Sequence, residues 1–325
     1  MMLVFDHVCV FYGDTPVLRE LSFQICSGEQ VGLIGANGAG KSTLMKAALG
    51  LLPYTGSITV DGTPVTRKTL PEVRRKLGYV LQDADNQMFM PTVLDDMVFG
   101  PMNYGLSRAA AEQRAEETLA ELHMEYLRDR HNHKMSGGEK RMAAVATILA
   151  MQPQMLLMDE PSTALDPRNR RTLIRVLRQR PETKLIASHD LNLVLETCSR
   201  VLLLAGGRLA ADGAAGEILR DRTLLEENGL EEAFALVYKD MYWLCLNGRA
   251  YILDGLQATQ TDRSAPYSTR QYAGFYCTNI PARVLWEQDG ALWFGTADGR
   301  LCAFANEPSD PLNYNDNGEA IYACW

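Results

Sequence analysis

The chain has 325 residues and a formal net charge of −8, a length that fits two domains better than one. Proteins that bind a phosphate backbone need clustered Lys and Arg, so this acidic balance argues against a nucleic-acid partner. No run of about 18 apolar residues occurs and the N-terminus lacks a secretory pattern, so we expect a chain that neither spans a membrane nor is secreted.

The first eighty residues predict a β-rich region that leads into a helix. Apolar or alternating runs bounded by Gly, Asp or Ser predict strands at residues 4–12, 21–25, 30–35 and 77–82. Residues 41–52 have helical spacing, and residues 56–65 predict a hairpin with Asp61-Gly62 at its tip.

The character changes to helical from about Asp83 to Met151, where Thr92 and Ser107 fit the N-caps of two helices. Strands return after this insert, separated by helical segments, and the alternation predicts a parallel sheet. We expect these strands at residues 155–160, 184–189 and 200–207. The pattern ends near Phe234, so the sequence predicts an α/β domain over residues 1–235, with a helical subdomain at about 84–151.

A glycine-rich turn between a strand and a helix predicts a phosphate-binding loop. Residues 35–43 fit the pattern G-x-x-x-x-G-K-[ST], and they lie in the context that the motif requires. The glycines let backbone N–H groups close around the β- and γ-phosphates of a nucleotide, Lys41 adds a charge, and the Ser42 hydroxyl can bind Mg²⁺. We expect the nucleotide to contact Gly35, Asn37, Gly38, Gly40, Lys41, Ser42 and Thr43.

Two carboxylates follow a buried apolar strand, at the sheet edge where phosphates lie in such folds. We expect Asp159 to face Mg²⁺, and Glu160 to orient and partly deprotonate the attacking water. The alternative is that both acids cap the next helix. The phosphate loop upstream favours the first interpretation.

Residues 135–139, Met-Ser-Gly-Gly-Glu, resemble the signature sequence of the ABC family of transport ATPases. A Ser at a helix start followed by two glycines exposes N–H groups to a phosphate. The resemblance implies that Ser136, Gly137 and Gly138 face a nucleotide held by a second ATPase subunit, identical or related, so that the chain works as a homodimer or heterodimer.

Other residues match this family's motifs in the family's order. Tyr12 is at the place of the aromatic residue that stacks on adenine, and Gln82 resembles the Q-loop glutamine that serves catalysis and Mg²⁺. Residues 162–166 resemble the D-loop, and His189 resembles the switch histidine that assists catalysis. Singly, each has a plainer interpretation: an edge-strand aromatic for Tyr12, a polar strand end for Gln82, and a core or capping histidine for His189.

The segments 77–106 and 136–171 look like ATPases of cobalt and nickel importers and of energy-coupling-factor vitamin importers, within a resemblance that covers about residues 2–233. It implies a P-loop NTPase fold, ATP and Mg²⁺ as ligands, and a peripheral position at the cytoplasmic face of the cell membrane. It also implies an integral membrane subunit, contacted by residues 83–101. Met135 and Glu139 depart from the usual Leu and Gln.

Two other functions remain open at this stage. The chain could be a soluble ABC ATPase, although such proteins usually carry two ATPase cassettes or a long coiled-coil insertion. It could also be a nucleotide-binding remnant whose C-terminal β-region binds a partner.

The composition shifts after residue 235: all four tryptophans and eight of the thirteen tyrosines lie in residues 236–325, with Lys239 as the single lysine. Residues 242–253 and 293–304 align at an offset of 51, and each copy predicts two strands around an Asn-Gly or Asp-Gly turn. A third hairpin is expected around Asp289-Gly290. The pattern predicts a small all-β region that resembles β-propeller repeats. It could be a β-domain that senses something or binds a partner, a module for oligomerisation, or a fragment of an unrelated β-repeat protein.

Overall fold

The structure, a computed structural model, divides into two compact units, residues 1–230 and 231–325. It describes residues 2–230, with side chains throughout except at position 222. In the second unit it describes the backbone of ten strands, together with the side chains of Trp293 and Phe294.

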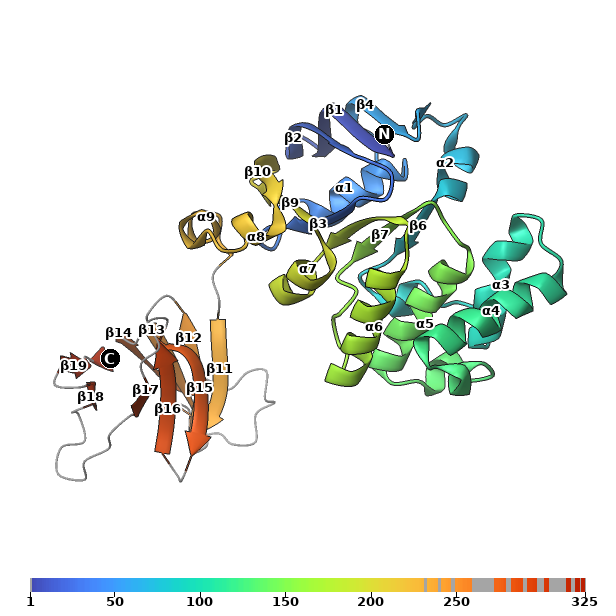
Figure 1. Cartoon of the computed structure of the whole chain (residues 1–325). Helices are drawn as coiled ribbons and strands as arrows, with labels where there is room; N and C mark the ends of the chain where they lie inside the picture. The colour runs from blue at the N-terminus through green and yellow to red at the C-terminus, as the bar shows by residue number, and fades with distance from the viewer. Residues whose placement is uncertain are drawn as a thin grey trace. The chain divides into compact units, whose positions relative to one another are not determined.

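A six-stranded sheet forms the centre of the first unit (Figure 1). Its strands follow the order β10 (Arg208–Ala214), β9 (Arg200–Ala205), β3 (Gln30–Ile34), β8 (Thr183–Ala187), β7 (Met155–Asp159) and β6 (Leu77–Val80). Neighbours are parallel except for the edge strand β10, which runs antiparallel to β9. The predicted parallel sheet is therefore confirmed, and β10 adds an antiparallel edge to it.

Two apolar layers cover the two faces of this sheet. Met155 and Leu157 of β7 belong to a core cluster that includes α1 (Lys41–Ala48). Leu156 and Met158 belong to the other cluster, which includes α6 (Pro167–Gln179) and α7 (Leu191–Thr197). Successive side chains of a strand point to opposite faces, so one continuous apolar run serves both layers.

A smaller antiparallel sheet covers the α1 side of the unit (Figure 1). It contains β2 (Thr15–Ile25), β1 (Leu3–Tyr12), β4 (Thr55–Val60) and β5 (Thr63–Pro64). The predicted hairpin is confirmed, since β4 pairs with β5 across Asp61 and Gly62, whose φ angles are 47° and 74°. Positive φ at both central positions is the requirement that an Asp-Gly turn meets. The helix α2 (Leu70–Lys76) leads from this sheet to β6.

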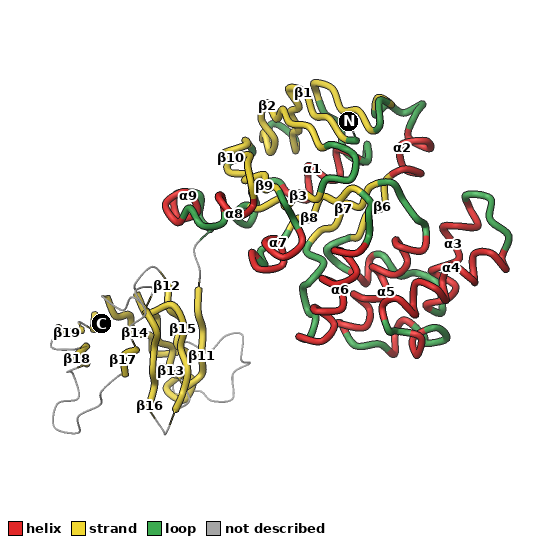
Figure 2. The backbone as a smooth tube through the Cα atoms, viewed as in Figure 1, coloured by secondary structure: helices red, strands yellow, loops and turns green. Residues whose placement is uncertain are grey.

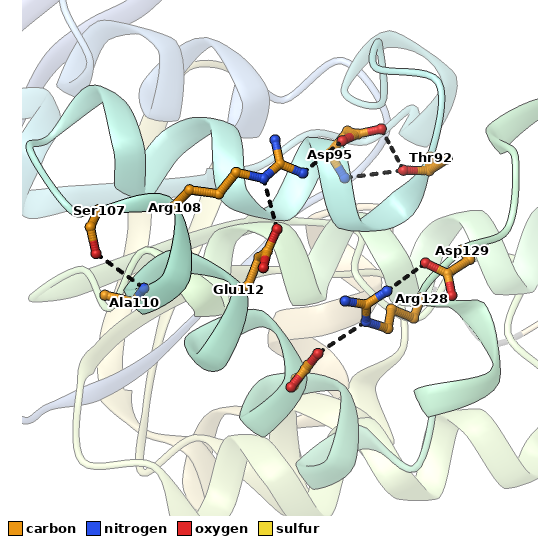
Figure 3. A network of polar contacts seen from close by, with 9 residues as sticks. Thr92, Asp95, Ser107, Arg108, Ala110, Glu112, Arg128 and Asp129 are labelled. Atoms are coloured by element: carbon orange, nitrogen blue, oxygen red, sulfur yellow. Dashed lines mark hydrogen bonds and ion pairs between the residues drawn. The ribbon is translucent and has the colours of Figure 1, made fainter.

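The helical part groups together, away from the antiparallel sheet (Figure 2). It contains α3 (Val93–Asn103), α4 (Arg108–Leu122) and α5 (Gly137–Ala150), with single 3₁₀ turns at Ala84–Asn86, Glu125–Leu127 and Asn132–Lys134. Both predicted caps are confirmed: Thr92 Oγ1 accepts the N–H of Asp95 at 3.2 Å, and Ser107 Oγ accepts the N–H of Ala110 at 3.3 Å (Figure 3). An exposed ion pair between Arg108 and Glu112, four residues apart, links the first two turns of α4.

Two short helices, α8 (Ala215–Ile218) and α9 (Arg222–Glu227), follow β10. Asp221 caps α9, as Asp166 caps α6 and Asp190 caps α7. Among the described residues, no helix combines the length and the apolarity that crossing a bilayer requires.

The second unit is all-β where it is described. A five-stranded antiparallel sheet has the order β11 (Ala233–Tyr238), β12 (Met241–Leu246), β13 (Arg249–Ala258), β14 (Tyr272–Thr278) and β20 (Ala323–Cys324). A three-stranded sheet contains β15 (Ala282–Gln288), β16 (Ala291–Thr296) and β17 (Leu301–Ala303). The strands β18 (Tyr314–Asp316) and β19 (Glu319–Ile321) form a further pair.

The strand pairs predicted in this region are confirmed: β12 pairs with β13, β15 with β16, and β16 with β17. The turn residues named for them, at 247–249, 289–290 and 298–300, lie outside the described residues except for Arg249. The β-propeller resemblance is not supported, since propeller blades have four strands and the described sheets have five, three and two.

Candidate active site

The phosphate-binding loop connects β3 to α1 and needs its glycines. Gly38 and Gly40 have φ angles of 80° and 107°, a region that residues with side chains rarely adopt. A Cβ on Gly35 would stand 2.3 Å from the Leu204 carbonyl oxygen of the neighbouring strand β9. The backbone can therefore curl tightly enough for its N–H groups to face a common point.

Lys41 is folded against this loop. Its Nζ donates to the carbonyl oxygens of Gly35 at 2.6 Å and Ala36 at 3.2 Å. Burial lowers the pKa of Lys41, and the carboxylates of Glu160 and Asp159 oppose that effect. The loop thus holds a buried amine between its own carbonyl groups and two acidic neighbours.

Asp159 ends β7 and is 2% exposed. The Tyr79 hydroxyl, on the adjacent strand β6, donates to Asp159 Oδ2 at 3.3 Å. Burial raises the pKa of Tyr79, and the negative charge of Asp159 raises it further. Tyr79 therefore stays a proton donor, and it orients the carboxylate.

Glu160 has an unusual backbone and an incompletely paired carboxylate. Its φ is 51°, in the left-handed region, and its N–H donates to the Ala187 carbonyl at 2.9 Å. Oε2 accepts hydrogen bonds from the His189 N–H at 3.1 Å and the Ser188 hydroxyl at 3.4 Å. Oε1 is buried and lies 3.2 Å from His189 Nε2, but it accepts no hydrogen bond from any described residue.

The phosphate-binding loop, Asp159 and Glu160 line one cavity of about 280 Å³. It brings together ten of the residues that the sequence predicted, namely Asn37, Gly38, Gly40, Lys41, Ser42, Thr43, Gln82, Asp159, Glu160 and His189. The other predicted residues do not line it: the Gly35 carbonyl accepts from Lys41 Nζ, half-exposed Tyr12 ends β1, and Ser136, Gly137 and Gly138 start α5.

The cavity fits a divalent cation that is held in part by phosphate oxygens. Three residues that line the cavity beside the phosphate loop offer oxygen ligands: a carboxylate from Asp159, a hydroxyl from Ser42 and an amide oxygen from Gln82. No group of three or more His, Cys, Asp or Glu side chains forms a metal cage among the described residues. Mg²⁺ commonly uses one or two protein oxygens together with substrate phosphates, so this donor set suits it.

Comparison with known proteins identifies the family. Residues 18–163 match the ABC transporter family. A protein of Geobacter sulfurreducens, named as an ABC transporter ATP-binding protein, is 46% identical over 231 residues, which are 70% of this chain and 93% of that protein. The chain belongs to the ATP-binding proteins of ABC transporters. It is therefore an ATPase coupled to transmembrane transport.

Two further relatives are similar to the same part of the chain. The cobalt import ATP-binding protein CbiO of Rhodobacter capsulatus is 44% identical over 226 residues, covering 68% of this chain and 81% of that protein. The solved structure of cbiO1 from Clostridium perfringens, described as part of the ABC transporter complex cbiONQ, superposes with a TM-score of 0.61 at 31% identity. That match covers 70% of this chain and 94% of the other.

Residues 135–139, which resemble the ABC signature, form a capped helix start that does not line the cavity of the chain. Ser136 Oγ accepts the Glu139 N–H at 3.3 Å, and Glu139 Oε2 accepts the Ser136 N–H at 2.8 Å. These two bonds form a capping box. Glu139, which replaces the usual Gln, is thus used in the cap, and Met135 is buried where Leu is usual.

Three residues at the site, Val17, Tyr79 and Ser188, belong to none of the sequence motifs. Val17 lines the cavity from β2, Tyr79 binds Asp159, and Ser188 binds Glu160. Ser188 immediately precedes the predicted switch histidine, a position that could have drawn attention to it. Tyr79 had no local signal, because its role follows from the pairing of β6 with β7.

Proposed function

We propose that this ABC ATPase powers an importer of cobalt, nickel or a vitamin of the energy-coupling type, from the cytoplasmic face of the membrane. The similarity to a cobalt import ATP-binding protein at 44% identity supports the importer, as do the segments 77–106 and 136–171. The observation that carries the hydrolytic role is the carboxylate of Glu160: the residue lines the cavity together with the phosphate loop, and its buried Oε1 accepts no hydrogen bond from the described residues.

The residues suggest how the site works. Backbone N–H groups of residues 35–43 bind the β- and γ-phosphates of ATP, and the Lys41 amine turns from the loop carbonyls toward them. Ser42, Gln82 and Asp159 would hold Mg²⁺, which when bound neutralises charge on the phosphate oxygens. Tyr79 keeps the Asp159 carboxylate oriented, because its hydroxyl donates to Oδ2.

Glu160 serves as the base in this proposal. One of its oxygens, Oε2, is occupied by the His189 N–H and the Ser188 hydroxyl, and this pairing holds the carboxylate in place. The other, Oε1, is left to accept a proton from the attacking water. The His189 ring stands 3.2 Å from Oε1 and is partly exposed, so it is available to the terminal phosphate.

A second ATPase subunit, identical or related, completes each site in this proposal. The start of α5 presents Ser136 and Gly137 to solvent, with the positive end of a 14-residue helix behind them. The chain's own cavity is lined by other residues. We therefore infer that Ser136, Gly137 and Gly138 bind the nucleotide of the partner subunit, and that Tyr12 stacks on the adenine of its own.

A membrane subunit docks on residues 83–101 in this proposal. Phe89 is 66% exposed and Phe99 43% exposed, and their rings meet edge to face with centroids 5.0 Å apart. Buried Asp96 holds the segment in place, since its Oδ1 accepts the N–H groups of Phe89 and Met90 at 3.1 Å. An exposed aromatic pair on a fixed backbone suits an apolar helix of a partner.

Uptake measurements test the proposal. A strain that lacks this chain should accumulate less cobalt, nickel or vitamin than its parent, and the intact chain should restore uptake while Glu160→Gln should not. The purified protein should hydrolyse ATP in the presence of Mg²⁺ and lose this activity when the ion is chelated. Normal uptake of all three cargo classes in the deficient strain would refute the importer, and failure to bind Mg-ATP would refute the ATPase site.

A further inference from the structure

Arg141 is a buried cation that no sequence motif singled out. It lies in the second turn of α5 and is 3% exposed. Its guanidinium donates short hydrogen bonds to the carbonyl oxygens of Leu81 and Glu160. It also donates to the carbonyl of Gln82 at 2.9 Å and reaches that of Asp159 at 3.4 Å. One side chain thus joins three elements: α5, the end of β6 and the end of β7.

These partners are unusual for a buried charge. All four hydrogen bonds of the guanidinium to described residues go to backbone carbonyl groups, although the carboxylates of Asp159 and Glu160 are close enough to act on its charge. Burial lowers the pKa of Arg141, and those two carboxylates oppose the shift. A planar guanidinium has five N–H donors in a fixed fork, which suits several carbonyl groups at defined positions.

One of the two carbonyls that Arg141 binds most closely belongs to Glu160, a residue in a strained conformation. Glu160 has a φ of 51°, and such a backbone persists only where the surroundings hold it. Its N–H is held by Ala187, and its carbonyl accepts from both Arg141 and the Thr163 N–H at 3.2 Å. Because both polar groups of the Glu160 backbone are bound, the starting point and direction of its side chain are held, and the contacts of Oε2 then place the carboxylate.

A second contact joins the same two segments. Gly138, in the first turn of α5, lies against the carbonyl of Ala164, so that a Cβ there would stand 3.1 Å from that oxygen. Ala164 also has a positive φ, of 64°. The helix start that bears the ABC signature therefore contacts residues 160–164 at two points, through Gly138 and through Arg141.

We propose that Arg141 is a positioning residue for ATP hydrolysis, which holds Glu160 in its left-handed conformation and ties it to the helix start bearing the ABC signature. When a partner's nucleotide closes on Ser136, a displacement of α5 reaches Glu160 of the same subunit through this side chain. The inference rests on the proposed role of Glu160 as the base. It adds a route by which binding of the partner's nucleotide at Ser136 changes the position of Glu160 in the chain's own site.

The test compares three variants of the full chain: Arg141→Gln, Arg141→Lys and the control Lys140→Met. Lys140 is the preceding residue of α5, and it forms an exposed ion pair with Asp85. Steady-state hydrolysis gives kcat and KM, and equilibrium titration with Mg-ATP gives Kd. Arg141→Gln should lower kcat on the order of 10- to 100-fold, since misplacing a catalytic group by about 1 Å has that effect. KM and Kd should stay within about twofold, because Arg141 does not itself line the cavity.

The conservative variant Arg141→Lys should keep part of kcat, because an ammonium reaches one or two carbonyls but cannot reproduce the fork. Lys140→Met should keep kcat and KM within about twofold, as expected for an exposed pair. Wild-type kcat in Arg141→Gln would overturn the proposal, and so would an equal loss in Lys140→Met. If Arg141→Gln does not fold, the same criterion of a reduced kcat at unchanged Kd applies to Arg141→Lys.

A double variant separates this inference from the proposed function. If Arg141 acts through Glu160, Arg141→Lys combined with Glu160→Gln should hydrolyse ATP in a single turnover no more slowly than Glu160→Gln alone. A further loss in the double variant would show that Arg141 acts elsewhere. If Glu160→Gln alone retains full hydrolysis, the proposed base is wrong. If it loses hydrolysis while both Arg141 variants remain fully active, only the positioning role fails.

Discussion

Replacing Glu160 by Gln tests the hydrolytic site with a minimal change of shape. The new amide oxygen can still accept from the His189 N–H and the Ser188 hydroxyl, which now bind Oε2. The amide nitrogen takes the place of Oε1, the oxygen that accepts no hydrogen bond from the described residues, and it cannot accept a proton from water. A general base contributes about 10²- to 10⁴-fold to the rate. The activation free energy should therefore rise by about 3 to 5 kcal/mol, at about 1.4 kcal/mol for each factor of ten.

The assay combines phosphate release with equilibrium binding of Mg-ATP. We expect kcat to fall by at least about 100-fold, whereas Kd should change by less than about threefold, because Glu160 is not expected to contact the phosphates in the ground state. Glu117→Gln, a substitution of an exposed glutamate on α4, is the matched control and should leave both quantities unchanged. Hydrolysis within tenfold of the intact protein, or a parallel loss of binding and hydrolysis, would refute the assignment.

Four further predictions concern binding, stability, docking and the domain boundary. Gly35→Ala should abolish nucleotide binding in an equilibrium titration, because the added Cβ would stand 2.3 Å from the Leu204 carbonyl; normal binding would contradict the loop geometry. Asp96→Ala should lower the free energy of unfolding in urea by about 3 kcal/mol, since it leaves two N–H groups of the 89–90 backbone without an acceptor. The double change Phe89→Ala with Phe99→Ala should reduce co-purification with a membrane subunit by about tenfold or more while the ATPase activity of the isolated chain persists, and undiminished co-purification would exclude this pair from the docking surface. Residues 1–230 alone should fold and bind Mg-ATP, because both large apolar clusters lie within residues 2–225, and loss of cooperative unfolding would show that the second unit is required.

Much of the first unit could be predicted from short-range patterns. Thr92 caps α3 and Ser107 caps α4 through hydrogen bonds to residues three positions further on. Such local caps can be predicted from the sequence alone. The phosphate loop is equally local, since its glycines, Lys41 and Ser42 lie within nine consecutive residues. The edge strand β10 could not be predicted, because apolar and polar residues alternate only weakly along it. Its extended conformation depends on pairing with β9.

The motifs by themselves determined that the chain has a phosphate loop, two carboxylates after a strand and a capped helix start with two glycines. Only the tertiary structure decided how they act on one another. Tyr79 meets Asp159 80 positions away, and Arg141 meets Leu81 60 positions away, because the order of strands β6, β7 and β8 brings their carboxyl ends to one edge. The same packing places the start of α5 outside the lining of the chain's own cavity. It also brings the His189 N–H to one oxygen of Glu160, while the other oxygen has no hydrogen-bond donor among the described residues. Such contacts arise from the burial of β7 and β8 between two apolar layers, a cooperative property of the folded chain that no short segment contains.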